Sequence, residues 1–319
     1  MVAALSVAAL AGCSPYGFSK EVGDFDASAK GLATSVAAGH QTLRDDALAA
    51  ARRDLIYHQR RVAIPVSCQP GQSVKDGPPC RPYAVGGSPV IADPDPIDPK
   101  VKELVTVLNA YTGALAAVTK ASDRAEFDKE VGNLAKAVQG LMAATGVGVT
   151  AAPVIAAGVN LFGWLVGTAL DIQRYETLRN AVNAVDAPAK NDVKPMKTIA
   201  NTLQGELVVL MEVRQGKLLD EAALVRRRIG PGNSDETYRT RLADLEALLA
   251  AVEDLRKADP AAAAQGLAKA HEELVAAVNN PKIDFEQLIK SLGELKDKVE
   301  AVQKALSEAS GAGSAKKGA

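Results

Sequence analysis

The sequence predicts an all-α fold, a bundle of long antiparallel amphipathic helices around a Gly/Ala-rich apolar hairpin. Aromatic residues make up only 4% of the 319 residues, while alanine, leucine and valine are abundant. This composition favours helices with closely spaced axes over β-sandwiches. No run of alternating β-branched residues is long enough to predict a sheet. The pattern is clearest near the C-terminus, where apolar residues are separated alternately by three and four positions: Phe285, Leu288, Leu292, Leu295, Val299, Val302 and Leu306.

The first helix is expected over residues 27–61. Its apolar residues stand close to helical spacing, at Leu32, Val36, Leu43, Leu48, Leu55 and Val62. Pro65 ends this pattern because proline cannot continue a helix interior. We expect residues 13–26, which precede the helix, to form a tether.

A long connection follows over residues 64–99. It holds nine prolines, a density that excludes both helix and sheet interior. It also contains Cys68 and Cys80, the two cysteines that the sequence has besides Cys13. In an exported protein such a pair predicts a disulfide bond. Two free thiols are the alternative, and a metal pair is a further one, although no histidine or third cysteine accompanies them.

Helix starts are marked along the rest of the chain. Asp98 followed by Pro99 is a cap and first-turn pair, and it predicts a helix from residue 99 to about residue 140. Further helices are expected over residues 171–185 and 192–228. The next helix follows the turn at residues 230–234, is capped by Ser234, and has apolar residues at Leu242, Leu245, Leu249 and Val252.

The same signals predict the last helices. Asp259 and Pro260 repeat the cap-and-proline pair. Asp284 starts the final helix, with Gln287 as its capping-box partner. The alternating three-and-four spacing of this helix forms a heptad seam, which would pack on neighbouring helices of the same chain or join a partner protein in a coiled coil. Residues 310–319 are expected to be a disordered tail.

The central segment is unusual because residues 137–170 contain no charged side chain over 34 positions. One interpretation is a buried helical hairpin, in which Gly163 and Gly167 allow close helix packing. A second is an apolar tongue that enters a bilayer. A third is a transmembrane span, which Pro153 and Asn160 disfavour. The large side chains that would contact a membrane or a partner are Phe162, Trp164 and Leu165.

The tongue interpretation is based on a resemblance. A Gly/Ala-rich apolar segment between long helices is similar to the α-helical pore-forming toxins of the haemolysin E and cytolysin A type. The resemblance is one of composition and covers about residues 140–170. It implies that residues 146–170 insert into membranes.

The N-terminus has the features of a secretory signal. An apolar run ends in Leu10, Ala11 and Gly12, directly before Cys13. This arrangement resembles the lipobox of bacterial lipoproteins, and the resemblance implies cleavage after residue 12 and lipidation of Cys13. The alternative is a buried N-terminal turn with an ordinary cysteine. Ser14 is compatible, in proteobacterial members of that family, with sorting to the outer membrane.

Composition and motifs limit the function. The net charge of −1 gives no electrostatic case for nucleic acid as a partner. None of the three histidines, His40, His58 and His271, lies in a zinc-protease motif, and the sequence has no phosphate-binding loop or nucleophile elbow. We therefore expect no enzyme, no cofactor and no metal site. The expected protein is a periplasm-facing lipoprotein with a structural or protein-interaction role, and a membrane-inserting or pore-forming protein is the alternative.

Overall fold

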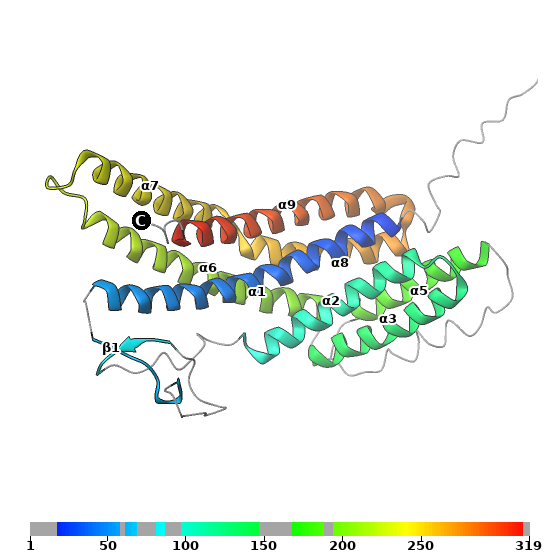
Figure 1. The fold of residues 1–319 in the computed structure, drawn as a ribbon. Coiled ribbons are helices and arrows are strands. Elements are labelled where there is room, and N and C mark those ends of the chain that lie inside the picture. Colours follow the sequence, from blue (N-terminus) through cyan, green and yellow to red (C-terminus); the bar gives the residue numbers. More distant parts are fainter. Residues whose placement is uncertain are drawn as a thin grey trace, which may run out of the picture. The chain divides into compact units, whose positions relative to one another are not determined.

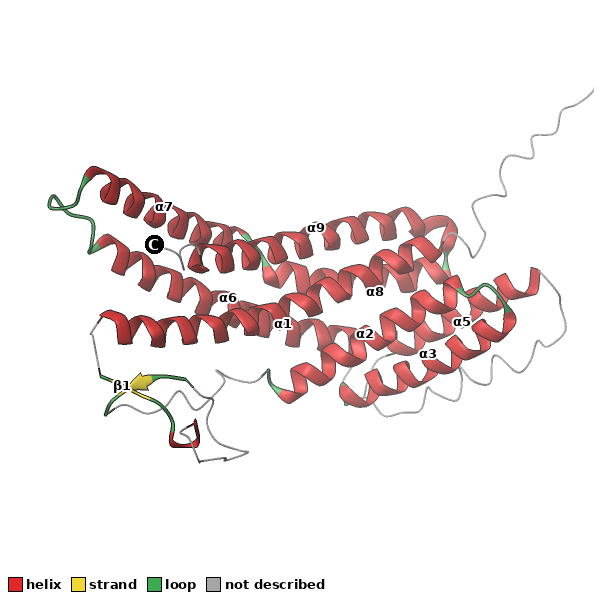
Figure 2. Ribbon diagram, in the orientation of Figure 1, coloured by secondary structure: helices red, strands yellow, loops and turns green. Residues whose placement is uncertain are grey.

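The structure is a computed structural model that describes residues 18–57, 61–68, 81–86, 97–146, 168–187 and 194–314. It confirms the all-α fold, since helices dominate these ranges and strands are almost lacking in them (Figures 1 and 2). The elements, in order, are α1 (Phe18–Tyr57), β1 (Val62–Ala63), the short 3-10 helix η2 (Val66–Cys68), β2 (Tyr83–Ala84), α2 (Pro99–Lys120), α3 (Arg124–Ala144), α5 (Thr168–Asp186), α6 (Pro195–Arg226), α7 (Asp235–Lys257), α8 (Pro260–Asn279) and α9 (Pro281–Ser314).

The chain divides into two compact units. Unit 1 comprises residues 1–35, 100–208 and 258–304, and unit 2 comprises residues 36–99, 209–257 and 305–319. Helices α2, α3, α5 and α8 therefore belong to unit 1, whereas α7 belongs to unit 2. Helices α1, α6 and α9 contribute residues to both units.

The first turns of α1 correct the expected tether. The helix begins at Phe18, so residues 18–26 are helical. Phe18, Val22 and Phe25 are buried, and they continue the apolar stripe of the helix by steps of four and three. Phe18 stacks edge-on against Phe285 of α9, with ring centroids 5.3 Å apart. This stripe extends the helix because its burial stabilises turns that lack a capping signal.

The helix expected from residue 99 to about residue 140 is in fact two helices. A break at residues 121–123 separates α2 from α3. The Asp123 side chain accepts a hydrogen bond from the Glu126 backbone N–H at 2.9 Å. In return, the Glu126 carboxylate accepts hydrogen bonds from the Ser122 N–H and hydroxyl group, which also lowers the Glu126 pKa. These capping residues could be recognised in the sequence, and their hydrogen bonds start α3 directly after the break that follows α2.

A buried arginine joins this break to α5. The Arg174 guanidinium donates to the Ala121 carbonyl and, at 2.8 Å, to the Asp171 carboxylate. Arg124, at the start of α3, also donates to Gln173. The N-terminal ends of α3 and α5 therefore lie together. The C-terminal end of α3 lies about 31 Å from its N-terminal end, because the helix has 21 residues. The connection to α5 therefore begins at the far end of α3 and leads back to Thr168, where α5 starts.

The apolar segment lies in that connection. Residues 147–167 are outside the described residues, and with them Phe162, Trp164 and Leu165. The Gly/Ala-rich hairpin of the predicted fold therefore stays a prediction. Among the helices that the structure describes, none has the length and apolarity that crossing a membrane requires.

The last two helices confirm one predicted start and correct another. Asp259 caps α8 by accepting from the Ala262 N–H at 2.8 Å, with Pro260 in the first turn, as expected. Helix α9 begins at Pro281 instead of Asp284, directly after the C-cap of α8. It also continues to Ser314, so residues 310–314 are helical and not part of a tail.

The heptad seam of α9 is buried within this chain. Six of its seven members are buried and Phe285 is half-buried. Of the two interpretations of the seam, the structure supports packing on neighbouring helices of the same chain.

Unit 2 has its own apolar core. It is formed by the ends of α1, α6 and α9 together with α7, and its buried members include Val36, Leu210, Leu218, Leu248, Val252, Leu255 and Leu306. Arg214 of α6 is buried and donates to the Ala309 carbonyl of α9. The Thr42 and Ser310 hydroxyl groups are hydrogen-bonded at 3.0 Å and join α1 to α9.

The proline-rich connection is described only in part. Its residues 62–63 and 83–84 form a two-residue antiparallel ladder, in which Val62 is opposite Ala84. Cys68 is disulfide-bonded. Cys80, the partner that the sequence predicts, lies outside the described residues, so the pairing itself stays a prediction.

A close helix contact in unit 1 gives a first prediction. A Cβ atom at Gly31 would lie 2.8 Å from the Val299 Cγ1 atom, and Val299 is buried and stiff. We expect Gly31→Ala to lower the free energy of unfolding by about 1 kcal/mol or more through overpacking. Gly293→Ala, where a Cβ meets nothing within 4 Å, should raise it by about 0.5–1 kcal/mol. Urea unfolding checks both, and equal effects at the two positions would contradict the proposed close contact.

Candidate functional site

Most of the site residues predicted from the sequence lie outside the described ranges. These are the lipidation residue Cys13, the second loop cysteine Cys80, and the apolar contact residues Phe162, Trp164 and Leu165. Cys68 is described and half-buried. The structure therefore neither joins nor separates these residues. Four other features lie in the described part of the chain: a buried polar pair, an ion-pair cluster beside it, a groove, and an exposed apolar row.

The buried polar pair lies in the core of unit 1. The Tyr111 hydroxyl of α2 and the His271 Nε2 atom of α8 are hydrogen-bonded at 2.9 Å, although 160 positions separate them in the sequence. Tyr111 is fully buried and His271 is 1% exposed. The rings of Tyr111 and Phe25 flank the imidazole, with centroids 5.9 and 6.1 Å from it.

Burial decides the protonation of both groups. It lowers the pKa of His271 to about 3, with a smaller contribution from the Lys194 cation, so the imidazole is neutral at pH 7. Burial also raises the pKa of the Tyr111 hydroxyl well above its usual value, helped by the Asp186 carboxylate. Tyr111 and His271 are therefore both neutral, and their hydrogen bond lies in the core of unit 1. Because both side chains are buried, a substrate cannot reach them.

An ion-pair cluster lies beside this pair. Lys194, just before α6, contacts the Asp186 carboxylate at the end of α5 at 2.9 Å and Glu272 of α8 at 3.5 Å. The Asp186 hydrogen bond is the main reason that the pKa of Lys194 is raised. The cluster connects three helices and explains part of the shift at His271 and Tyr111. It belongs to the packing of unit 1.

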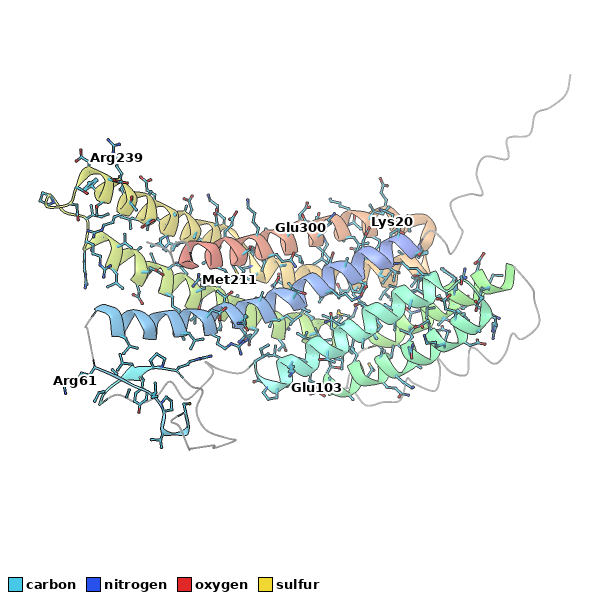
Figure 3. The ribbon with its side chains drawn as sticks, in the orientation of Figure 1. Lys20, Arg61, Glu103, Met211, Arg239 and Glu300 are labelled. Atoms are coloured by element: carbon cyan, nitrogen blue, oxygen red, sulfur yellow. The ribbon has the colours of Figure 1, made fainter. Side chains whose placement is uncertain are left out.

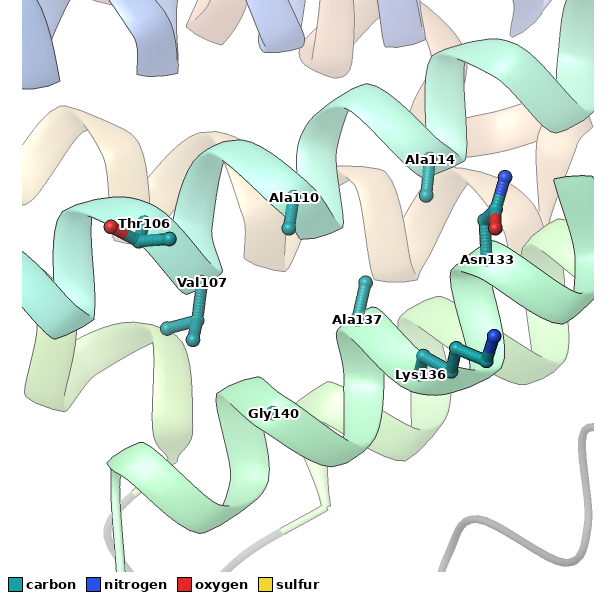
Figure 4. Close-up of a pocket in the computed structure, with 8 residues that line it drawn as sticks. All are labelled: Thr106, Val107, Ala110, Ala114, Asn133, Lys136, Ala137 and Gly140. Carbon is teal, nitrogen blue, oxygen red and sulfur yellow. The ribbon is translucent and has the colours of Figure 1, made fainter.

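A shallow groove runs between α2 and α3 (Figure 4). Its volume is about 300 Å³, and its floor is made of small or apolar side chains: Val107, Ala110, Ala114, Ala137 and Gly140. Thr106, Asn133 and Lys136 complete the lining. Only one lining residue is charged, so the groove lacks the converging polar groups typical of a small-molecule site.

The exposed apolar row lies on α7 in unit 2. It consists of Tyr238, Leu242, Leu245 and Leu249, which follow one another by steps of four, three and four, and we call it the α7 outer row. Tyr238 is 42% exposed, Leu242 38% and Leu249 47%, while Leu245 is half-buried. The sequence marked three of these as apolar positions of the helix, together with Val252, but of those four only Val252 is buried.

A second row explains why the outer row faces solvent. Leu248, Val252 and Leu255 pack into the core of unit 2 and fix the rotation of α7 about its axis. The turn before the helix is also held. Ser234 caps α7 through the Thr237 N–H at 3.3 Å, and Arg241 donates to Asn233 at 2.6 Å. Helix α7 therefore presents the outer row in a fixed direction.

Charges flank the row on one side. Arg239 directly follows Tyr238, and Glu246 directly follows Leu245, so the two lie seven residues apart on the same flank. Both are exposed, and the Arg239 side chain projects outward near the start of α7 (Figure 3). The four-three-four spacing was the signal in the sequence, but it could not reveal which apolar row of the helix faces the core.

Comparison of the chain with protein-family models, with curated proteins and with solved structures finds no match. Within the described ranges, no three histidine, cysteine or acidic side chains come together in a group that could hold a metal ion.

The buried histidine predicts how stability depends on pH. The unfolded chain binds a proton at this side chain near pH 6.5, whereas the folded chain does so only near pH 3. Between these values the unfolded state binds more protons, so the free energy of unfolding falls by up to about 1.4 kcal/mol for each unit that the pH falls below 6.5. His271→Gln keeps a polar partner for Tyr111 and removes this slope.

Urea unfolding of both proteins between pH 7 and pH 4 measures the difference. Other titrating groups are common to the two proteins, so the gap between their stabilities isolates His271. A gap that stays constant with pH would show that the histidine is not buried in its neutral form.

Proposed function

We propose that this protein is a lipid-anchored cell-envelope lipoprotein with a non-enzymatic, protein-interaction role, held through Cys13 at the outer membrane and facing the periplasm. The anchor is supported by the sequence Leu10-Ala11-Gly12-Cys13 after an apolar run. Acyl chains contribute about 0.8 kcal/mol per buried methylene, so two or three chains hold a protein without any spanning helix.

The structure adds a constraint on such an anchor. Helix α1 begins at Phe18, only five residues after Cys13, and those residues reach at most about 17 Å. Phe18 is itself packed against Phe285 and Tyr175. A lipid on Cys13 would therefore hold the start of α1 closer to the bilayer than the tether expected over residues 13–26 would.

The α7 outer row carries the interaction role. Three apolar side chains that are 38–47% exposed stand along one line on a helix whose other apolar row is buried. Contiguous exposed apolar surface of this kind marks contact sites, because leaving it in water costs free energy that a partner recovers. The heptad spacing fits a partner that is itself a helix.

The anchor is tested by metabolic labelling with an alkyne fatty acid in cells that make the protein. We expect the wild type to carry the label and Cys13→Ala to lack it, because the thiol is the acylated group. Cys80→Ala is the matched control and should keep the label. Labelling that persists in Cys13→Ala, or is missing from the wild type, would contradict the proposed anchor.

The interaction role is separated from membrane insertion with dye-loaded liposomes and Trp164 fluorescence. The protein is the mature chain from residue 13 with Cys13→Ala, and Trp164 is its single tryptophan. We expect no dye release and no change in Trp164 emission, because an interaction module keeps its apolar segment within the fold. Dye release with a blue shift would instead support the alternative, a pore-forming protein that uses residues 146–170.

A further inference from the structure

We propose that the partner of the α7 outer row is the same row on a second copy of this chain, bound antiparallel about a twofold axis. The inference deepens the proposed function, since it names the occupant of the surface on which that function rests.

The spacing of the row is symmetric about its centre. Read in either direction, the steps are four, three and four, so an antiparallel copy matches it position for position. Tyr238 then faces the second copy's Leu249, and Leu242 faces the second copy's Leu245. Such self-complementarity is what a twofold interface requires, since the same patch supplies both of its sides.

The flanking charges fit the antiparallel arrangement. Arg239 and Glu246 lie on the same flank of the row, one near each end. In an antiparallel pair, equivalent flanks of the two helices meet, and Arg239 then lies beside the second copy's Glu246. The symmetry repeats this contact, so each dimer gains two opposite-charge pairs. In a parallel pair this flank would instead meet the opposite flank of the second copy, so Arg239 and Glu246 would not pair with each other.

The orientation of α7 makes the row available without rearrangement. Leu248 and Leu255 are buried in unit 2, and the capped turn at Ser234 holds the start of the helix. A surface that is already held in its binding geometry loses little conformational entropy on association. The row spans 12 residues, about 18 Å, so the dimer is expected to be weak in solution. Anchoring both copies in one membrane would raise their effective concentration.

Charge reversal gives a test in which the variants repair one another. Arg239→Glu places two acidic pairs in the dimer, and Glu246→Arg places two basic pairs there. By sedimentation equilibrium on the lipid-free mature chain, we expect each single variant to dimerise at least about tenfold more weakly than the wild type. The double variant R239E/E246R restores opposite charges and should recover wild-type dimerisation.

Mixing the two single variants is the more decisive experiment. Both flanking positions are acidic in the Arg239→Glu copy, and both are basic in the Glu246→Arg copy. In a mixed pair each acidic side chain therefore meets a basic one, so the mixture should associate more tightly than either variant does alone. The apolar contact is tested by Leu242→Asp, which should abolish the dimer. Ile289→Asp and Glu286→Arg, at exposed positions of α9, are the matched controls and should leave it unchanged.

Different outcomes test the second-copy proposal and the proposed protein-interaction role. A wild type that stays monomeric into the millimolar range would overturn the second-copy proposal, as would a dimer insensitive to both charge reversals. Photo-crosslinking from position 242 in cells then decides the proposed function by itself. A product of twice the chain mass supports the second copy. A product of another mass keeps the interaction role but assigns the α7 outer row to a different protein. If position 242 forms no crosslinked product, the row is not the contact site and the interaction role loses its support.

Discussion

Burial of one apolar stripe per helix is the constraint on which the rest of this structure depends. The chain has few aromatic side chains, so its helices must approach closely to bury small and aliphatic residues. Gly31 shows the result, because the space for a Cβ atom there is taken by Val299. The same need extends α1 back to Phe18, whose ring is buried against Phe285 and Tyr175.

Polar groups in the core follow from the same packing. Helices packed this tightly enclose His271 and Tyr111, which remain neutral and are hydrogen-bonded to one another. They also enclose Arg174, whose guanidinium donates to a carbonyl at the break between α2 and α3. Each contact joins helices that are distant in sequence, so each specifies which helices are neighbours. The hydrogen bonds of these groups therefore help to specify the fold.

Helix α7 has two apolar rows. One row completes the core of unit 2, and the other faces solvent with charges of both signs on its flank. The two rows have different consequences. The inner row fixes the helix, and that rigidity turns the outer row into a surface of defined spacing. A lipid at Cys13, five residues before α1, would bring such surfaces together in one membrane, where even a weak self-complementary contact becomes populated.

By itself, the sequence determined the helical class, the starts of α2, α7 and α8, and the heptad spacing of α9, because caps, prolines and apolar spacing are local signals. It also contained the Asp123 cap that starts α3 and the stripe from Phe18 to Leu32, although longer periodic runs nearby obscured both. Only the tertiary structure decided that His271 meets Tyr111, and that Val252 turns inward while Leu242 and Leu249 turn outward. These outcomes depend on which helices become neighbours, and periodicity within one helix carries no information about that choice.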